Sequence, residues 1–286
     1  MTRRFLLSFL LPLVLGWTAT GAALASSPES PSRWYGADGA LLPFQTDDEL
    51  VEFLATAPVV ASAKAGRGVG GVLKLRLERD GVALHAAFRT VHIERSSSQA
   101  SRSVPDRHLW RDDFEFELAA YRLSKLLGLH RVPPTAPRKL DGRPGSVQLW
   151  IEGASTEADL IESGRATMNA ARHLQRQSML VFDNLIYNFD RHQNNMLYDS
   201  DGRLWFIDHT RSFKRLAELP DRERIAVCDR RLLEGLRALD EATLRRELSP
   251  YLEPLEVKAL VQRRKMLLEH FDKLIAERGE EQVLLE

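Results

Sequence analysis

The stretch that decides the fold of this chain runs from Asp183 to Asp208 and reads D-N-L-I-Y-N-F-D-R-H-Q-N-N-M-L-Y-D-S-D-G-R-L-W-F-I-D. Within it, Asp190 is followed five residues later by the amide of Asn195, and Asp208 ends an apolar run. Phosphoryl transfer needs a base that orients a hydroxyl group, and oxygen ligands for the metal ion on the nucleotide phosphates. Carboxylate and amide oxygens suit Mg²⁺ or Mn²⁺. We therefore predict that Asp190 is the catalytic base and that Asn195 and Asp208 are metal ligands.

The local pattern also predicts how these side chains are held. Residues 175–189 have apolar side chains at helical spacing and contain no glycine or proline, which indicates a helix. The apolar runs 196–198 and 203–207 flank a D-S-D-G turn, which indicates a β-hairpin. Asp190 and Asp208 would then lie at the same end of this hairpin. Taken alone, D-R-H could equally be a helix cap or an ion-pair cluster, and only the spacing to the later amide and carboxylate favours catalysis.

A second motif lies upstream and reads F-E-F-E-L-A-A-Y-R-L-S-K-L-L-G-L-H-R-V-P-P-T, from Phe114 to Thr135. Its apolar side chains recur on one helical face, which predicts a buried helix. Gly128 fits a C-terminal cap, and Pro133 and Pro134 stop any continuation. Glu117 belongs to this helix, where a glutamate is by default a solvated charge.

A glycine-rich segment, G-R-G-V-G-G, spans residues 66–71. Gly66, Gly68 and Gly71 match G-x-G-x-x-G, which is a weak signal by itself. Alternating strand residues follow across an R-D-G turn, whereas a dinucleotide-binding fold would place a helix there. We therefore predict the strand–loop–strand arrangement of a kinase, in which backbone N–H groups cover the phosphates.

Together these motifs resemble the Golgi casein kinases of the secretory pathway, and the D-R-H-x-x-N loop also resembles that of the phosphatidylinositol 3-/4-kinases. Ordinary protein kinases carry H-R-D and D-F-G instead, whereas here Asp208 is followed by His209 and Thr210. In the resembled family, the E-x-A-A-F/Y helix that ends in L-G-x-x-R-V-P-P carries an acid that assists phosphate and metal binding, which corresponds to Glu117. The resemblance implies ATP-dependent transfer of a phosphoryl group to a hydroxyl acceptor on a protein, glycan or lipid, with ATP and Mg²⁺ or Mn²⁺ as cofactors.

The phosphate-binding strand departs from the resembled family. The family's A-x-F-K lysine corresponds to Arg89 in A-A-F-R. Arg89 could still bind phosphate in a bidentate manner, or Lys74 on the neighbouring strand could supply the ammonium group. The alternatives are a nucleotide-binding pseudokinase or scaffold without transfer activity, and a metal-dependent hydrolase that uses the same acids. The run Gln148–Ala154 suits the hinge that meets adenine, with Glu152 among the nucleotide-binding residues, although a plain interdomain strand fits this run as well.

The N-terminus has two arginines, an apolar core and A-L-A before Ser26, which predicts a signal peptide cleaved after about Ala25. Pro12 interrupts the apolar run, which is short for a spanning helix, and an uncleaved anchor is the alternative. Cleavage leaves 38 basic and 40 acidic residues, so the charge gives no indication of nucleic acid binding. Cys228 is the single cysteine, so no intrachain disulfide can form. We expect an exported protein, periplasmic or extracellular, without stable membrane insertion after cleavage.

These patterns predict an α+β, bilobal protein-kinase-like fold with a β-rich N-terminal lobe and a mostly helical C-terminal lobe. The expected division is a signal peptide at 1–25, a flexible leader at 26–33, an N-terminal leader and β-rich nucleotide-binding lobe at 34–148, and a helical catalytic lobe at 149–286. A short helix capped by Thr46 or Asp47 should begin the ordered part, and residues from Asp221 onward read as packing helices. The sequence carries no signature of the acceptor or of the oligomeric state.

Overall fold

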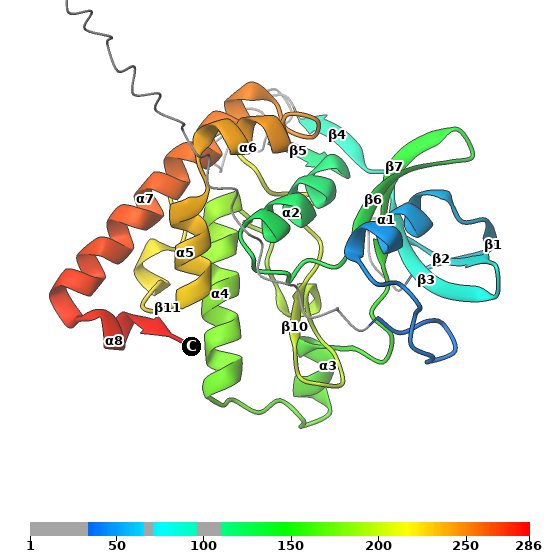
Figure 1. Ribbon diagram of the computed structural model, residues 1–286, viewed down its shortest axis with the longest axis horizontal. Coiled ribbons are helices and arrows are strands. Elements are labelled where there is room, and N and C mark those ends of the chain that lie inside the picture. Colours follow the sequence, from blue (N-terminus) through cyan, green and yellow to red (C-terminus); the bar gives the residue numbers. More distant parts are fainter. Residues whose placement is uncertain (1–33, 66–70, 96–109) are drawn as a thin grey trace, which may run out of the picture.

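The computed structural model describes residues 34–65, 71–95 and 110–286. In these residues a β-rich part packs against a mostly helical part (Figure 1), which confirms the predicted fold class. The predicted signal peptide and leader lie outside the described residues, as do Gly66 and Gly68. No helix within the described ranges has the length and apolar character needed to cross a membrane.

The β-rich part is built on a five-stranded antiparallel sheet with the strand order β1-β2-β3-β7-β6. Its strands are β1 (Val59–Lys64), β2 (Leu73–Arg79), β3 (Val82–Arg89), β6 (Thr135–Leu140) and β7 (Arg143–Leu149). Asp80 and Gly81 both have positive φ in the turn between β2 and β3, as a two-residue hairpin turn requires. The glycine-rich segment is followed by a strand, as predicted, and the dinucleotide-binding alternative is wrong.

The two faces of this sheet differ because successive side chains of a strand point to opposite sides. One face is buried against α1 (Asp47–Thr56), and its core side chains include Leu75, Leu84, Phe88 and Val147. Thr46 is the N-cap of α1 and forms a capping box with Glu49, which decides between the two predicted caps. The opposite face carries Lys74 and Arg89, which alternate with these core residues along β2 and β3.

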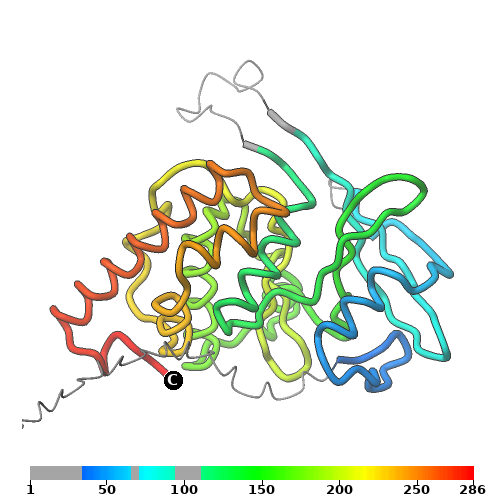
Figure 2. The backbone as a smooth tube through the Cα atoms, turned by 45° about the horizontal axis from the view of Figure 1, so that its top comes forward, coloured from blue at the N-terminus to red at the C-terminus, as the bar shows by residue number. Residues whose placement is uncertain are grey.

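Helix α2 (Glu115–Leu126) lies between the sheet and the helical part (Figure 1). Gly128 follows it with a positive φ, and the N–H of Leu129 donates to the carbonyl of Ser124, so the predicted glycine cap is confirmed. Glu117 is fully buried in this helix, and its default interpretation as a solvated charge is wrong. Two antiparallel strands that were not predicted, β4 (His92–Arg95) and β5 (Trp110–Asp113), lead into α2 and run side by side in Figure 2.

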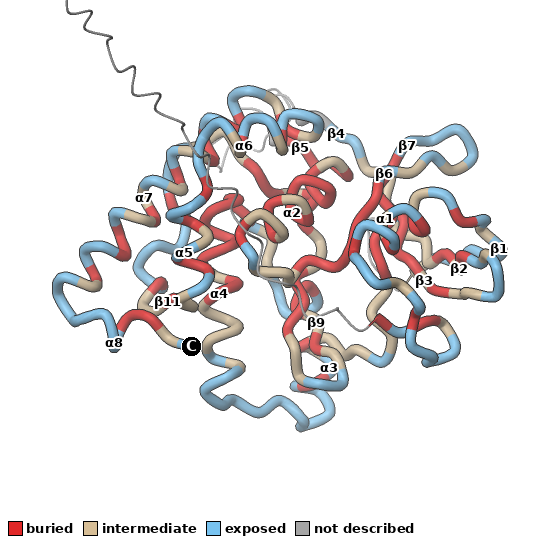
Figure 3. Tube along the Cα trace, viewed as in Figure 1, coloured by how far each residue is buried: buried red, intermediate tan, exposed pale blue. Residues whose placement is uncertain are grey.

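The helical part packs around α4, and Figure 3 shows the second half of this helix buried. Its helices are α3 (Glu157–Glu162), α4 (Ala170–Ile186), α5 (Arg230–Ala238), α6 (Glu241–Leu248), α7 (Pro254–Arg278) and α8 (Glu280–Val283), with 3₁₀ turns η1 (Gln193–Asn195) and η2 (Arg222–Arg224). Its short strands are β8 (Ser155–Thr156), β9 (Met196–Tyr198), β10 (Leu204–Phe206), β11 (Cys228–Asp229) and β12 (Leu284–Leu285). The order β10-β9-β8 contains the predicted β9–β10 hairpin, and β11 pairs in parallel with β12.

One buried side chain ties α7 to the segments that carry the candidate site. Arg263 is fully buried and donates to the carbonyls of Leu185 at 2.7 Å, Lys214 at 2.8 Å and Leu216 at 2.5 Å. Burial lowers the pKa of this guanidinium to about 9, so it remains charged at neutral pH. Arg263 therefore fixes the end of α4 against the chain that follows Asp208.

Candidate active site

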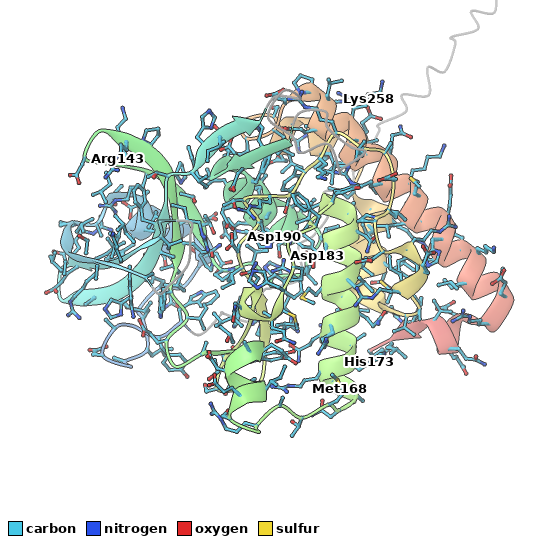
Figure 4. The ribbon with its side chains drawn as sticks, turned by 180° about the vertical axis from the view of Figure 1, so that it is seen from behind. Arg143, Met168, His173, Asp183, Asp190 and Lys258 are labelled. Carbon is cyan, nitrogen blue, oxygen red and sulfur yellow. The ribbon has the colours of Figure 1, made fainter. Side chains whose placement is uncertain are left out.

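Asp190 lies just beyond the C-terminal end of α4. The helix ends at Tyr187, whose φ of 53° turns the chain away from the helix axis. The side chain of Asn188 then donates to Asp183 at 3.1 Å and accepts the N–H of Asp190 at 3.1 Å. In Figure 4, Asp183 and Asp190 lie at this end of α4, and Met168 lies near its opposite end. The backbone that carries Asp190 is therefore fixed by the end of the helix.

Asn195 lies in η1, directly before β9, and is buried. Its Nδ2 donates to the carbonyl of Asp190 at 3.1 Å and lies 3.2 Å from Nε2 of His192. Because the loop occupies the amide nitrogen, Oδ1 is the atom that could coordinate a cation. His192 thus contacts Asn194 and Asn195 of the loop.

Asp208 directly follows the β9–β10 hairpin and adopts a left-handed backbone conformation with φ 63°. The N–H of Ile207 bonds to the carbonyl of Asn195 at 3.4 Å, so the amide and the second acid lie at the same end of the hairpin. Oδ1 of Asp208 lies 3.4 Å from Nη1 of Arg89 and 3.4 Å from Oγ1 of Thr210. Both contacts are to one carboxylate oxygen.

A series of buried polar contacts links α2 to the loop that carries Asp190. Nε of Arg89 lies 3.4 Å from Oε1 of Glu117. Glu117 accepts the N–H of His209 at 3.0 Å, and its Oε2 lies 3.0 Å from Nδ1 of the same histidine. On the far side of the ring, Nη2 of Arg191 lies 3.2 Å from Nε2 of His209. Because arginine can only donate, Nε2 must accept, and the neutral imidazole carries its proton on Nδ1 and donates to Glu117.

Arg191 is the last member of this series of polar contacts and lies in the loop that carries Asp190. Its guanidinium binds Asp183 through two bonds of 2.9 Å, and its Nη1 donates to the carbonyls of Asn195 at 2.6 Å and Ile207 at 2.7 Å. One side chain therefore joins α4, η1 and the end of the hairpin. The arginine of D-R-H therefore fixes the backbone on both sides of the hairpin's end.

The ionisation of Glu117 depends on its contacts with His209 and Arg89. Burial by itself would raise the pKa of this carboxyl group, because it penalises the charged form. The hydrogen bonds from His209 and the positive charge of Arg89 outweigh burial and lower the pKa to about 2. Glu117 is therefore ionised, and it fixes the guanidinium of Arg89.

The two candidate phosphate-binding cations lie in different surroundings. Arg89 is nearly buried and lies between Glu117 and Asp208. Lys74 instead has its ammonium nitrogen 4.4 Å from the centre of the Trp150 ring, just after β7. The guanidinium thus contacts the acids, and the ammonium group contacts the segment predicted to be the hinge.

The predicted hinge begins where β7 ends at Leu149. The N–H of Trp150 donates to the carbonyl of His85 at 3.0 Å, and Oε1 of Glu152 lies 2.6 Å from Nδ1 of His85. Glu152 therefore contacts β3 beside Trp150. Gly71 lies just before β2 and has a φ of 64°, a conformation that favours glycine.

Several residues that contact the candidate catalytic groups carry no motif that predicts their role. Asp183 and His209 belong to the series of buried polar contacts, and Arg211 bridges Asp190 and Asp112. A polar residue on the apolar face of the helix at 175–189 was a signal for Asp183. No local pattern indicates the pairing of Arg211 with Asp112, because the two residues lie 99 positions apart.

Two cavities lie away from these groups, on another side of α2. Their volumes are about 280 Å³ and 380 Å³, and both are bordered by Leu118, Pro137, Pro250 and Tyr251. Neither is lined by Asp190 or by any of the predicted metal ligands. We therefore locate the candidate site by its ionised groups and not by cavity volume.

The residues present fit a hard divalent cation. Within the described ranges, no three His, Cys, Asp or Glu side chains come together as a metal site. Asn195 and Asp208 offer two oxygens, and Mg²⁺ is commonly held by one or two protein oxygens together with phosphate oxygens and water. The set suits Mg²⁺ or Mn²⁺ and lacks the nitrogen and sulfur donors typical of zinc.

The β-rich lobe and the helical lobe together form a kinase-like fold. Among solved structures, the chain is similar to hydra Fam20 with sugar, with a TM-score of 0.64 and 16% identity over 84% of this chain and 92% of that chain. It is also similar to the Golgi casein kinase with Mn/ADP bound, with a TM-score of 0.58 and 17% identity over 84% of this chain and 78% of that chain. No family model and no curated protein matches the chain.

At these identities the likeness concerns the fold. It confirms the resemblance to Fam20-like atypical kinases, which include the Golgi casein kinase. The resemblance of the D-R-H-x-x-N loop to phosphatidylinositol kinases stays a prediction.

Proposed function

We propose that this protein is an ATP-dependent phosphotransferase that moves a phosphoryl group to a hydroxyl acceptor. One observation carries the proposal: Asn195 and Asp208 share the end of the hairpin with the loop of Asp190, and Arg89 joins Asp208 to Glu117. This set combines a base, oxygen ligands and a cation for phosphate, which are the parts that phosphoryl transfer requires. The Golgi casein kinase with Mn/ADP bound supports a nucleotide and a divalent metal as cofactors.

The proposed step is a displacement at the γ-phosphorus of ATP. The acceptor oxygen bonds to phosphorus, the bond to the bridging oxygen breaks, and ADP leaves with that electron pair. Asp190 orients the hydroxyl group and takes its proton. Asn195 and Asp208 would hold Mg²⁺ or Mn²⁺, and the bound ion would offset phosphate charge. Arg89, fixed by Glu117, binds phosphate oxygens with its planar fork.

The remaining predicted residues belong to the nucleotide side of the proposal. Gly66 and Gly68 lie outside the described residues, and we propose that they and Gly71 would bind the phosphates through backbone N–H groups. Lys74 and Glu152 would border the nucleobase beside Trp150. The contacts of Lys74 and Glu152 with the hinge segment support this division. We also propose that the protein is exported after cleavage near Ala25, and that its acceptor is a protein, glycan or lipid hydroxyl.

A pseudokinase is the second candidate, and Arg89 is the observation that favours it. Its Nη1 lies 3.4 Å from Oδ1 of Asp208, so a guanidinium already neutralises a proposed metal ligand. A lysine carries a more compact charge than this planar fork. In this alternative the same residues bind nucleotide for sensing or scaffolding without transfer.

An assay with γ-labelled ATP and Mg²⁺ or Mn²⁺ separates the candidates. The purified protein is offered protein, glycan and lipid hydroxyl acceptors, and the expected result is metal-dependent label on one class of acceptor. A metal-dependent thermal shift with ATP but no turnover identifies the pseudokinase. Release of labelled phosphate without a labelled acceptor identifies a metal-dependent hydrolase and contradicts the proposal.

A further inference from the structure

Arg211 joins two carboxylates that come from distant parts of the chain. Its Nη1 lies 3.1 Å from Oδ2 of Asp190, and its Nε lies 2.9 Å from Oδ2 of Asp112 in β5. The hydrogen bond to Asp112 and the charges of Asp190 and Asp208 raise the pKa of Arg211, so it is a permanent cation. The proposed base is therefore paired with a cation that β5 also holds.

Asp112 is fixed on both sides by its chain neighbours. Arg111 binds Glu256 of α7 through bonds of 3.1 Å and 2.9 Å. The N–H of Asp113 donates to the carbonyl of Thr210 at 2.8 Å. Strand β5 is thus attached to the helical lobe before and after Asp112, and this carboxylate, about nine-tenths buried, has a defined place beside Arg211.

The backbone around Arg211 is equally fixed. Thr210 precedes it and accepts the bond from β5, and Phe213 follows two residues later. Phe213 is fully buried, its N–H donates to the carbonyl of Ile186 at 2.5 Å, and its ring centre lies 5.5 Å from that of Phe116. Arg211 therefore extends from an anchored segment.

The guanidinium of Arg211 uses different nitrogens for its two carboxylate partners. A guanidinium that faces a single carboxylate tends to bind both of its oxygens. Here Nε is directed to Asp112 and Nη1 to Asp190, so the ion pair takes one oxygen of Asp190 and leaves Oδ1 for an acceptor proton. Asp112 thus limits how far Arg211 occupies the base.

We propose that Arg211 is a positioning residue for Asp190 and that Asp112 of β5 sets this position, so that β5 regulates the geometry of the base. The inference rests on the proposed function, because it assigns Asp190 the role of base. Removal of Arg211 lets the carboxylate of Asp190 rotate. Removal of the charge of Asp112 lets Arg211 turn and bind both oxygens of Asp190. Either change impairs the same proton transfer.

The kinetic test uses Arg211→Gln, Asp112→Asn and the double variant. Each single change should lower kcat about tenfold or more while the KM for ATP stays within about twofold, since orientation of the base is affected and nucleotide binding is not. The double variant should lose no more than the more impaired single variant, because both residues act through one contact. Full multiplication of the two losses, or an unchanged kcat, overturns the proposal.

Arg122→Gln is the matched control. The side chain of Arg122 is 40% exposed, as is that of Arg211, and Arg122 bridges α2 to Glu247 in α6 without contact to the site. This variant should leave kcat and KM unchanged. An equal loss of kcat in Arg122→Gln would mean that any bridging arginine supports activity through stability, and would contradict the positioning role.

A second measurement does not depend on activity. The ¹⁵N resonance of the Arg211 Nε–H, assigned by its loss in Arg211→Gln, should shift in Asp112→Asn and in Asp190→Asn but stay in place in Arg122→Gln. An unresponsive resonance overturns the contact whatever the enzyme does. If the resonance responds but the protein transfers no phosphoryl group, the proposed function and the positioning role of Arg211 in catalysis are both overturned, and the contact itself remains.

Discussion

The two sides of the candidate site are held very differently. On the acid side, Glu117, His209 and Arg191 form consecutive contacts between side chains that are at most 9% exposed. On the hinge side, the contact between His85 and Glu152 stands apart from this series and leaves both side chains 22% exposed. The protein's own contacts thus organise the acids in advance, whereas the hinge side keeps accessible polar groups that a nucleobase could meet.

The largest effect on rate should come from the organised side. Asp190→Ala removes the proposed base and should lower phosphoryl transfer by about 10²–10⁴-fold. The thermal shift caused by ATP should persist, because Asp190 is not among the proposed nucleotide ligands. An unchanged rate in this variant would contradict the mechanism.

The stability of the fold should depend most on the buried ion pair between Asp183 and Arg191. Asp183→Ala leaves Arg191 without its bidentate carboxylate and should lower the free energy of unfolding by about 3–5 kcal/mol, because a buried charge loses its partner. Urea unfolding followed by circular dichroism measures this loss. Asp272→Ala, which removes the exposed partner of Arg237, is the control and should cost less than about 1 kcal/mol. Equal losses in the two variants would contradict the larger contribution assigned to the buried ion pair of Asp183 with Arg191.

Acid should weaken the organised side through Glu117. Its pKa is about 2 in the folded protein and near 4.5 when the group is unperturbed, so the folded state favours the ionised form. The resulting stabilisation is fully present above about pH 4.5 and is lost as the pH falls towards 2, with a total of roughly a few kcal/mol. Glu117→Gln should therefore reduce the dependence of the unfolding free energy on pH between about pH 4.5 and pH 2. If the unfolding free energy of this variant changes with pH as steeply as that of the wild type, the lowered pKa assigned to Glu117 is wrong.

The smallest effects should distinguish the two cations. Arg89→Ala should weaken ATP binding by about tenfold and leave adenosine binding unchanged, because the guanidinium contacts the acids and not the hinge. Lys74→Ala should weaken ATP and adenosine equally, by about threefold, because its ammonium group contacts Trp150. Isothermal titration calorimetry with both ligands checks the pattern. The reverse pattern would make Lys74 the phosphate ligand.

Elements with local signals could be predicted from the sequence. The β9–β10 hairpin follows from its D-S-D-G turn, and the end of α2 follows from Gly128 and the two prolines, because these residues restrict the backbone where they stand. The N-cap of α1 could be narrowed to Thr46 or Asp47, because a cap side chain bonds within the first turn of its own helix, and the structure shows that it is Thr46. The kinase-like fold class could be predicted because the glycine-rich segment, the helix within 114–135 and the hairpin stretch 183–208 follow one another in the order typical of kinases.

Contacts between distant segments could not be predicted. Strands β4 and β5 carry no alternating apolar pattern, and the pairing of Arg211 with Asp112 depends on how β5 docks on the helical lobe. Arg89 and Lys74 share one face of the sheet, so strand periodicity cannot separate them. Burial of Glu117 likewise follows from packing, because a lone glutamate in a helix has no local reason to be inside.

The contacts of Arg263 imply that the helical lobe cannot be shortened from its C-terminal end without disturbing the candidate site. This side chain of the last long helix binds carbonyls from the end of α4 and from the segment after Asp208, which together flank the candidate acids. A fragment that stops before α7 would leave these carbonyls without their donor and would lose the local order of the loop. Helix α7 is thus needed for the local order of the candidate acids. Truncation of the chain before α7 would disrupt the candidate site while leaving the five-stranded sheet in place.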